Sequence, residues 1–318
     1  MNKTHSDIAS YLSNKFENLN YNINYRFPNI KVRKTIKLCF IKFYRGFNPI
    51  SFIYKLDNKT FNFKIDNKNP DYVLYCVSSK NHSNIKYKNA IKIAIFNENK
   101  IPDLNEADYS IGHIHLNYLD RYFKIFKYFN LKMLINIINN RKFTLKRKKR
   151  KLFCAAVISN YYSGDLFRIK FINELNKYKK VDMGGKFKNN IGGMVKDKIQ
   201  FLTSYKFSIA MENSGCDGYY SEKILQSFLS GTIPIYYGDY MIDEYFNPKS
   251  FILIKGEKDL QKKIDYIKRI DNDDKLYRSI LKEKVFNSKK ILDMIKEEKS
   301  FLNHIFEQDK LKAYRINK

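Results

Sequence analysis

Hydrophobic residues along the chain are grouped in short runs of strand length, with polar loops and helix-period segments between them. In the first half, these runs predict strands at residues 34–43, 52–63, 72–77, 91–96 and 108–116. Residues 118–139 carry apolar positions at helical spacing and predict one helix. We therefore expect residues 31 to about 140 to form an α/β domain, preceded by a polar and irregularly helical segment.

The second half of the chain alternates strands and helices in the same manner. An apolar strand at residues 152–158 precedes a helix at 165–177 and a glycine- and asparagine-rich loop at 181–193. Lysine-rich helices are expected further on, at residues 259–270, 275–285 and 289–306. Their outer faces could lie on acidic lipid, but we favour ordinary solvated faces.

The most informative stretch covers residues 206–251. It predicts a buried strand at 207–211, a helix at 219–230 that ends at Gly231, and a second buried strand at 233–237. Two strands joined by a crossover helix run parallel and form a right-handed βαβ unit. Ligands of open α/β sheets bind where the strands end and the helices begin. The polar residues at this corner are Glu212, Asn213, Ser214, Tyr219, Ser221, Glu222 and Lys223.

Basic residues near two predicted helix starts favour an anionic ligand. Arg168 lies near the start of one helix and Lys223 in the first turn of another. A helix N-terminus with a nearby Lys and Arg stabilises a diphosphate through charge and through backbone amides. Alternatively, Glu222 and Lys223 form an exposed pair in which Glu222 merely complements the helix dipole.

Glu98 is the candidate for acid–base chemistry in the first domain. It follows the predicted strand at 91–96, and a carboxylate that faces a cleft beyond a strand end can act as a general base. The alternative is an ordinary loop carboxylate, one of 32 acidic residues in the chain.

The chain has a formal charge of +28, from 60 Lys and Arg residues against 32 Asp and Glu residues. This surplus favours an anionic partner such as a nucleic acid, a nucleotide or an anionic membrane surface. A general compositional bias explains it as well, because Lys, Asn and Ile are abundant throughout. The basic run at residues 146–151 resembles a nuclear-localisation or polybasic membrane signal, but we favour a solvated interdomain linker.

Several classes of site lose support from the sequence. No GxxxxGK[ST] loop is present, and no GxGxxG follows a strand. The Asp271–Asp273 pair resembles a metal-binding DxD motif but is predicted to lie in a turn between helices, and His113 and His115 lack an evident third ligand.

The separated cysteines fit reduced core thiols, and neither a leader nor a membrane span is expected. We expect a cytoplasmic protein that is at most peripheral at the inner face of a membrane.

The corner at residues 206–251 resembles the α-1,3/1,4-fucosyltransferase family. The residues that carry the likeness are MENS at 211–214, YYSEK at 219–223 and IPI at 233–235. Ser159, Asn160, Arg168 and the Gly184–Gly185 pair match the family's order and spacing upstream, and the FNEN segment at 96–99 is similar to its acceptor-side segment. The resemblance covers residues 70 to about 265. Asn97, Met211 and Ser221 depart from the family's usual Gly, Phe and Thr, and the C-terminal heptad repeats of some bacterial members are missing.

The resemblance implies an α/β fold of two Rossmann-like domains that face each other across a cleft, the GT-B architecture. It implies an acceptor-side domain at residues 1–145 and a donor-binding domain at 146–265. The helices of 266–318 would pack on the body or face a membrane. The donor would be GDP-L-fucose. The acceptor would be a GlcNAc or Glc hydroxyl of a galactoside-containing glycan such as a lipopolysaccharide or Lewis-type oligosaccharide, and no nucleic-acid partner is expected.

The family resemblance also implies a role for each candidate residue. Glu98 would be the general base, and Arg168 and Lys223 would carry the charge that develops on GDP. The expected donor contacts are Asn213, Tyr219, Glu222, Ser159 and Asn160. No cofactor is required and no metal site is expected, although a divalent metal could stimulate the reaction. The sequence leaves open the acceptor, the α-1,3 or α-1,4 linkage, another nucleotide sugar as donor and, in a different class, a basic nucleic-acid-binding protein.

Overall fold

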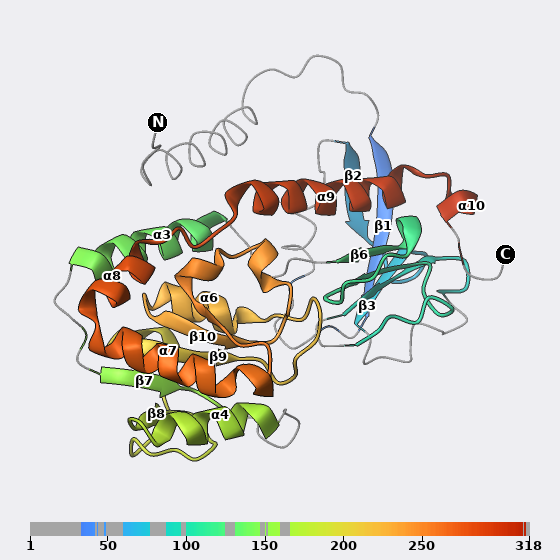
Figure 1. Cartoon of the computed structure of the whole chain (residues 1–318). Coiled ribbons are helices and arrows are strands. Elements are labelled where there is room, and N and C mark those ends of the chain that lie inside the picture. Colours follow the sequence, from blue (N-terminus) through green and yellow to red (C-terminus); the bar gives the residue numbers. More distant parts are fainter. Residues whose placement is uncertain are drawn as a thin grey trace, which may run out of the picture. The chain divides into compact units, whose positions relative to one another are not determined.

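The computed structural model (Figure 1) describes residues 33–41, 43, 48, 60–76, 87–96, 100–124, 131–146, 150, 152–159, 166–313 and 315. These residues form two α/β units. One unit is taken from Asn22–Phe126 together with Leu292–Lys318, and the other contains Lys127–Ile291. The predicted boundaries at residues 145/146 and 265/266 differ from this division, for reasons that lie in how the helices pack. No helix among the described residues is both long enough and apolar enough to cross a bilayer.

The first unit is built on a parallel sheet with the strand order β2-β1-β3-β4-β5-β6. The strands are β1 (Lys34–Ile41), β2 (Phe61–Ile65), β3 (Tyr72–Cys76), β4 (Ile91–Ile95), β5 (Tyr109–Gly112) and β6 (Tyr122–Lys124). The strands predicted near 34–43, 72–77, 91–96 and 108–116 are therefore confirmed with shorter bounds. Only the end of the strand predicted at 52–63 is described, and it begins β2.

The single helix predicted over residues 118–139 is wrong. Leu119 has a left-handed backbone conformation, with φ at 49°, and starts a one-turn 3-10 helix, η3 (Leu119–Arg121), that leads directly into β6. Arg121 fixes this arrangement, since its guanidinium donates hydrogen bonds to the carbonyl oxygens of Asp108 (2.9 Å) and Leu104 (2.6 Å). The helix α3 (Leu131–Lys146) begins only afterwards.

The C-terminal helices α9 (Ser288–Glu307) and α10 (Lys310–Ala313) supply part of the core of the first unit. Phe306 is fully buried, and its ring lies 5.0 Å from that of Tyr72 in β3. Ile305 and Ala313 are buried in the same hydrophobic cluster. The chain therefore returns to its first sheet at its C-terminal end.

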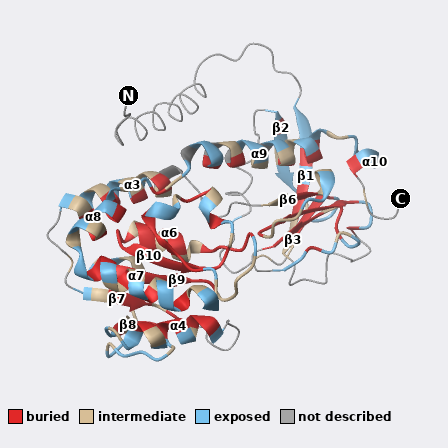
Figure 2. Cartoon of the chain, in the orientation of Figure 1, coloured by how far each residue is buried: buried red, intermediate tan, exposed pale blue. Residues whose placement is uncertain are grey.

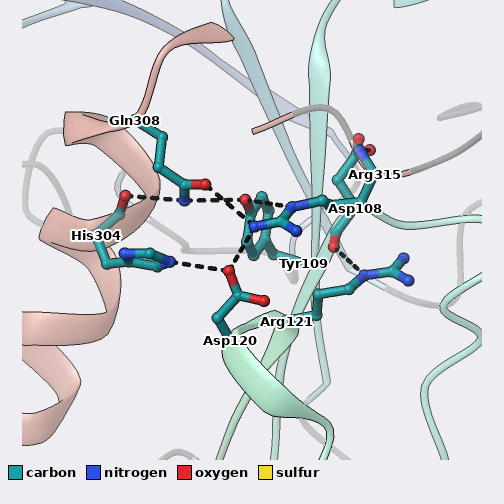
Figure 3. A network of polar contacts seen from close by, with 7 residues as sticks. All are labelled: Asp108, Tyr109, Asp120, Arg121, His304, Gln308 and Arg315. Atoms are coloured by element: carbon teal, nitrogen blue, oxygen red, sulfur yellow. Dashed lines mark hydrogen bonds and ion pairs between the residues drawn. The ribbon is translucent and has the colours of Figure 1, made fainter. Parts of the chain in front are cut away.

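Polar contacts reinforce this packing (Figure 3). Asp120 accepts hydrogen bonds from His304 in α9 (3.0 Å) and from Arg315 (2.5 Å). Gln308 donates to the hydroxyl of Tyr109 in β5 (3.0 Å). These contacts attach the segment after α9 to the strands β5 and β6.

The second unit has a parallel sheet with the order β11-β10-β9-β7-β8. Its strands are β7 (Leu152–Ala156), β8 (Val181–Met183), β9 (Tyr205–Met211), β10 (Ile233–Tyr237) and β11 (Ile252–Leu253). Its longer helices are α4 (Leu166–Asn176), α5 (Lys198–Leu202), α6 (Glu222–Leu229), α7 (Leu260–Asn272) and α8 (Asp274–Lys282). Single 3-10 turns are η4 (Ile242–Glu244), η5 (Pro248–Ser250) and η6 (Glu257–Asp259).

The predicted βαβ unit is confirmed as β9-α6-β10. The two strands are parallel, with Ile233 opposite Phe207, and every residue of both is buried (Figure 2). Helix α6 begins at Glu222, three residues later than predicted, because residues 215–220 form a loop that is tied to the end of β10. In that loop the N–H of Gly218 donates to Asp239 (2.7 Å).

Helix α3 belongs to the second unit, so this division begins before the predicted boundary at residues 145/146. The guanidinium of its Arg141 is buried and donates to the carbonyl oxygens of Ser250 (2.8 Å) and Ile280 (3.2 Å). Arg150, in the basic run, donates to the carbonyl oxygens of Tyr205 and Ser230, both at 2.7 Å. At Arg150, therefore, the run is structural and not a solvated linker. The rest of 147–151 lies outside the described residues.

Candidate functional site

Glu212 is the centre of the predicted corner. It directly follows β9, and its carboxylate is completely buried. The carboxylate accepts hydrogen bonds from the Ser221 N–H (2.7 Å), from the Ser221 hydroxyl and from the Lys223 ammonium (2.7 Å). A buried carboxylate is tolerated when it is paired and hydrogen-bonded in this way. Glu212 therefore fixes the start of α6 relative to the end of β9.

Lys223 is held in a defined position by this carboxylate. Its ammonium donates to Glu212 and to the Ser221 hydroxyl (2.9 Å), and 22% of its side chain is exposed. An ammonium has three N–H donors, so these contacts leave one for a ligand. Ser221 is the N-cap residue of α6, but its hydroxyl makes no capping bond because it donates to Glu212. A helix start without a side-chain cap, beside an oriented lysine, favours an anion.

Arg168 and Asn213 form the second part of the corner. Arg168 lies in the first turn of α4 and is only 2% exposed. Its Nη1 donates to Oδ1 of Asn213 (2.9 Å), the residue after Glu212. The structure thus brings a buried guanidinium to the end of β9, where the Glu212 cluster also lies.

Tyr219, Glu222 and Ser159 are the remaining predicted donor residues that the structure describes. Tyr219 is buried in the loop before α6, and Glu222 is the half-buried first residue of the helix. Ser159 lies just beyond β7, the neighbour of β9, and its hydroxyl accepts a long hydrogen bond from the Lys186 N–H (3.4 Å). Asn160 and Glu98 lie outside the described residues. The last described residue before Glu98 is Phe96, whose N–H donates to the carbonyl oxygen of Ile111 in β5 (2.8 Å).

The structural role of Glu212 was not predictable from the sequence. Glu212 and Ser221 were visible as polar residues after a strand and before a helix, but their pattern did not reveal which carboxylate would be buried. The spacing Glu-x8-Ser-x-Lys is the only available signal, and it gains meaning once the loop of 215–220 returns Ser221 to the strand end.

The alternative metal sites are engaged in other contacts. Asp271 forms a buried ion pair with Lys206 (2.5 Å), and Asp273 caps α8 by accepting from the N–H groups of Lys275 and Leu276. His115 Nε2 lies 2.6 Å from the Lys124 ammonium. Within the described part of the chain, no three His, Cys, Asp or Glu side chains are grouped as metal ligands would be. The described cysteines form no disulfide.

Two parallel-sheet α/β units, one of which has a cationic corner at its strand ends, define a glycosyltransferase fold of the GT-B class. A solved crystal structure of an α1,3-fucosyltransferase has this fold: it aligns with a TM-score of 0.72 and 25% identity over 92% of this chain and 95% of that one. A crystal structure of α1,3-fucosyltransferase with GDP-fucose aligns with a TM-score of 0.63 and 25% identity, over 86% and 93% of the two chains.

The family follows from the sequence comparisons. The model described as "Glycosyltransferase family 10 (fucosyltransferase) C-term" matches residues 146–305, and "Alpha-(1,3)-fucosyltransferase FucT N-terminal domain" matches residues 38–131. The chain belongs to glycosyltransferase family 10, the fucosyltransferases. It is 30% identical over 234 residues to the alpha-(1,3)-fucosyltransferase FucT of Helicobacter pylori. The aligned region covers 64% of this chain and 49% of that protein. The chain thus spans about half the length of this curated relative.

Proposed function

We propose that this protein transfers L-fucose from GDP-L-fucose to a hydroxyl of a galactoside-containing glycan, forming an α-1,3 or α-1,4 linkage with inversion. The observation that carries the proposal is the pair of cations at the end of β9, Lys223 on Glu212 and Arg168 on Asn213, in the segment that matches the family's C-terminal model. Both cations are positioned by the fold, so they can meet a diphosphate without reorganising.

In this proposal the second unit binds the donor. Lys223 and Arg168 contact the diphosphate through charge-assisted hydrogen bonds, which are the strong ones for phosphate oxygens. Asn213, Tyr219 and Glu222 contact hydroxyls of the ribose or the fucose, and Ser159 and Asn160 contribute from the end of β7. No cofactor takes part, although a divalent metal could raise the rate.

The proposed chemistry is a single displacement at the anomeric carbon of fucose. The acceptor oxygen forms a bond to the anomeric carbon. At the same time the bond between that carbon and the diphosphate oxygen breaks, and GDP leaves with the electron pair. Glu98 takes the proton of the acceptor hydroxyl as general base. Lys223 and Arg168 stabilise the negative charge that develops on GDP.

The proposed acceptor is a lipopolysaccharide or Lewis-type oligosaccharide. We place the enzyme in the cytoplasm, with peripheral contact to an anionic membrane surface. The support for this contact is the formal charge of +28, because acidic lipid attracts a basic protein.

The proposal is tested by incubating the protein with GDP-fucose and N-acetyllactosamine, lactose and a panel of related glycans. Mass spectrometry should find a fucosylated product and GDP in equal amounts, and linkage analysis of that product assigns the α-1,3 or α-1,4 bond. Absence of product with every acceptor, while GDP-fucose binds, would exclude this acceptor class.

A transferase of another GDP- or UDP-sugar is the alternative, because the cationic corner recognises the diphosphate that these donors share. Thermal shifts with GDP and UDP distinguish a GDP-sugar donor from a UDP-sugar donor. Stabilisation by GDP alone is the result that the proposed donor requires, whereas stabilisation by UDP alone supports a UDP-sugar.

A further inference from the structure

Helix α5 starts beside the corner that holds Lys223. Helix α5 leads into β9 and α6 leads into β10, and these strands are parallel neighbours, so both helices begin on the side where the strands end. The two helices are in contact. Asp197 caps α5 by accepting from the N–H of Gln200 (2.9 Å), which makes Lys198 the first residue of the helix. Lys198 is therefore close to the first turn of α6.

Lys198 is surrounded by the charged residues of the donor corner. Burial lowers the pKa of its ammonium, Glu222 raises it, Lys223 lowers it and Glu212 raises it, with a net lowering. Lys198 is half-buried, and its ammonium has no hydrogen-bond or ion-pair partner among the described residues. Lys196, two positions earlier, is exposed to solvent.

A partly buried lysine beside another lysine is unfavourable unless an anion offsets it. Glu222 and Glu212 supply negative charge near Lys198, and Glu212 already accepts hydrogen bonds from Ser221 and Lys223. A diphosphate at this corner would add the negative charge that two neighbouring lysines favour.

We propose that Lys198 is a further binding residue for the diphosphate of the donor, which it contacts together with Lys223. This inference rests on the proposed function, because it takes a nucleoside diphosphate as the ligand of this corner. An ordinary solvated helix start is the competing explanation, and it predicts no effect of Lys198 on phosphate binding.

The ammonium of Lys198 should also link binding to pH. A bound diphosphate favours the protonated ammonium, so GDP affinity should fall as the pH rises through the lowered pKa of Lys198 in the free protein. Glu222, Glu212 and Lys223 are the charged groups that face it and shape this response. An arginine at this position stays charged throughout, so Lys198→Arg should reduce this pH dependence.

The experiment is calorimetric titration of the full chain with GDP, GMP, guanosine and UDP, for wild type, Lys198→Met, Lys198→Arg and the control Lys196→Met. Loss of one charged hydrogen bond predicts about a tenfold or larger decrease in GDP affinity for Lys198→Met, with guanosine affinity kept. Lys196→Met should bind GDP within about twofold of wild type.

Each outcome separates this inference from the proposed function. Lys198→Met with wild-type GDP affinity overturns the inference, and so does an equal loss of guanosine affinity, which indicates a structural role. If wild type binds UDP and not GDP, the proposed donor is wrong. In that case a selective loss of UDP affinity in Lys198→Met still supports a diphosphate-binding lysine.

Discussion

In the proposed function, Glu212 and Lys223 combine a structural and a binding role within one ion pair. Removal of Lys223 leaves the completely buried Glu212 with Ser221 alone, so an activity lost in that variant could reflect damage to the corner and not a missing phosphate contact. The two roles can be separated because Glu212 can be made neutral without a change of shape.

We predict that Lys223→Met lowers both stability and GDP affinity, and that the double variant Glu212→Gln/Lys223→Met regains stability but not affinity. Loss of a partner from a buried carboxylate costs about 1–3 kcal/mol here, since Lys223 is partly exposed. Urea unfolding and GDP titration of the single and double variants form a double-mutant cycle. Recovery of GDP affinity in the double variant would show that Lys223 does not bind the diphosphate.

At this scale the sequence predicted which residues meet and not how they are held. The resemblance to the family identified Arg168, Asn213 and Lys223, and the structure places them at one strand end. The role of Glu212 depends on its burial by surrounding elements, and no local pattern encodes that burial. Asp271 shows the same limit, because its partner Lys206 is 65 positions away.

Among the elements, the ends of β7 and β8 approach so closely that only glycine fits between them. A Cβ at Gly185 would overlap the backbone carbonyl of Ile158, whereas a Cβ at Gly193 would meet nothing within 4 Å. The carbonyl of Ile158 also accepts the N–H of Phe187 (2.9 Å), which holds the loop after β8 in place.

We predict that Gly185→Ala destabilises the second unit by about 1–3 kcal/mol, the usual cost of overpacking, and that it impairs donor binding at the neighbouring Ser159. Gly193→Ala is the matched control and should unfold within about 0.5 kcal/mol of wild type. Thermal unfolding with and without GDP measures both effects. Equal melting temperatures for the two variants would contradict the close approach.

Strands and helices were predictable where one period extended over several residues, as in β9-α6-β10. The prediction of one helix failed at residues 118–139. The apolar residues there have helical spacing, but some of them belong to the strand β6. There, the pairing of Ser110 with Tyr122 and the hydrogen bonds of Arg121 to distant carbonyls override the local pattern.

In the chain as a whole, the C-terminal segment returns to the first sheet and completes the core of the first unit. Apolar burial of Phe306 and Ile305 attaches α9, and Asp120 then binds His304 and Arg315 (Figure 3). Sequence alone could not predict this return, since it joins residues almost 200 positions apart that carry no shared motif.

We predict that this attachment weakens in acid. Burial raises the Asp120 pKa, but the hydrogen bond from His304 and the charges of Arg315 and His304 outweigh burial and hold it below its usual value. The carboxylate therefore contributes stability above its unfolded-state pKa of about 4, and this contribution is lost as the pH falls through the lower folded-state pKa.

Hydrogen exchange of α9 between about pH 6 and pH 3 tests this, with Asp120→Asn as the comparison. Wild type should be better protected than Asp120→Asn near neutral pH, and the difference should shrink as the pH falls. A difference that is constant with pH would rule out titration of Asp120 as the cause.

In the proposed reaction, fucose is transferred with Glu98 as the base and the second unit as the donor site. The direct measurement is the rate of fucose transfer from saturating GDP-fucose to an accepted glycan, for wild type, Glu98→Gln and the control Glu106→Gln, with GDP-fucose affinity measured alongside. We predict transfer by wild type and Glu106→Gln, and a rate lower by about 10²–10⁴ for Glu98→Gln with donor affinity retained. Undiminished transfer by Glu98→Gln, or no transfer by wild type with any acceptor, would contradict the account.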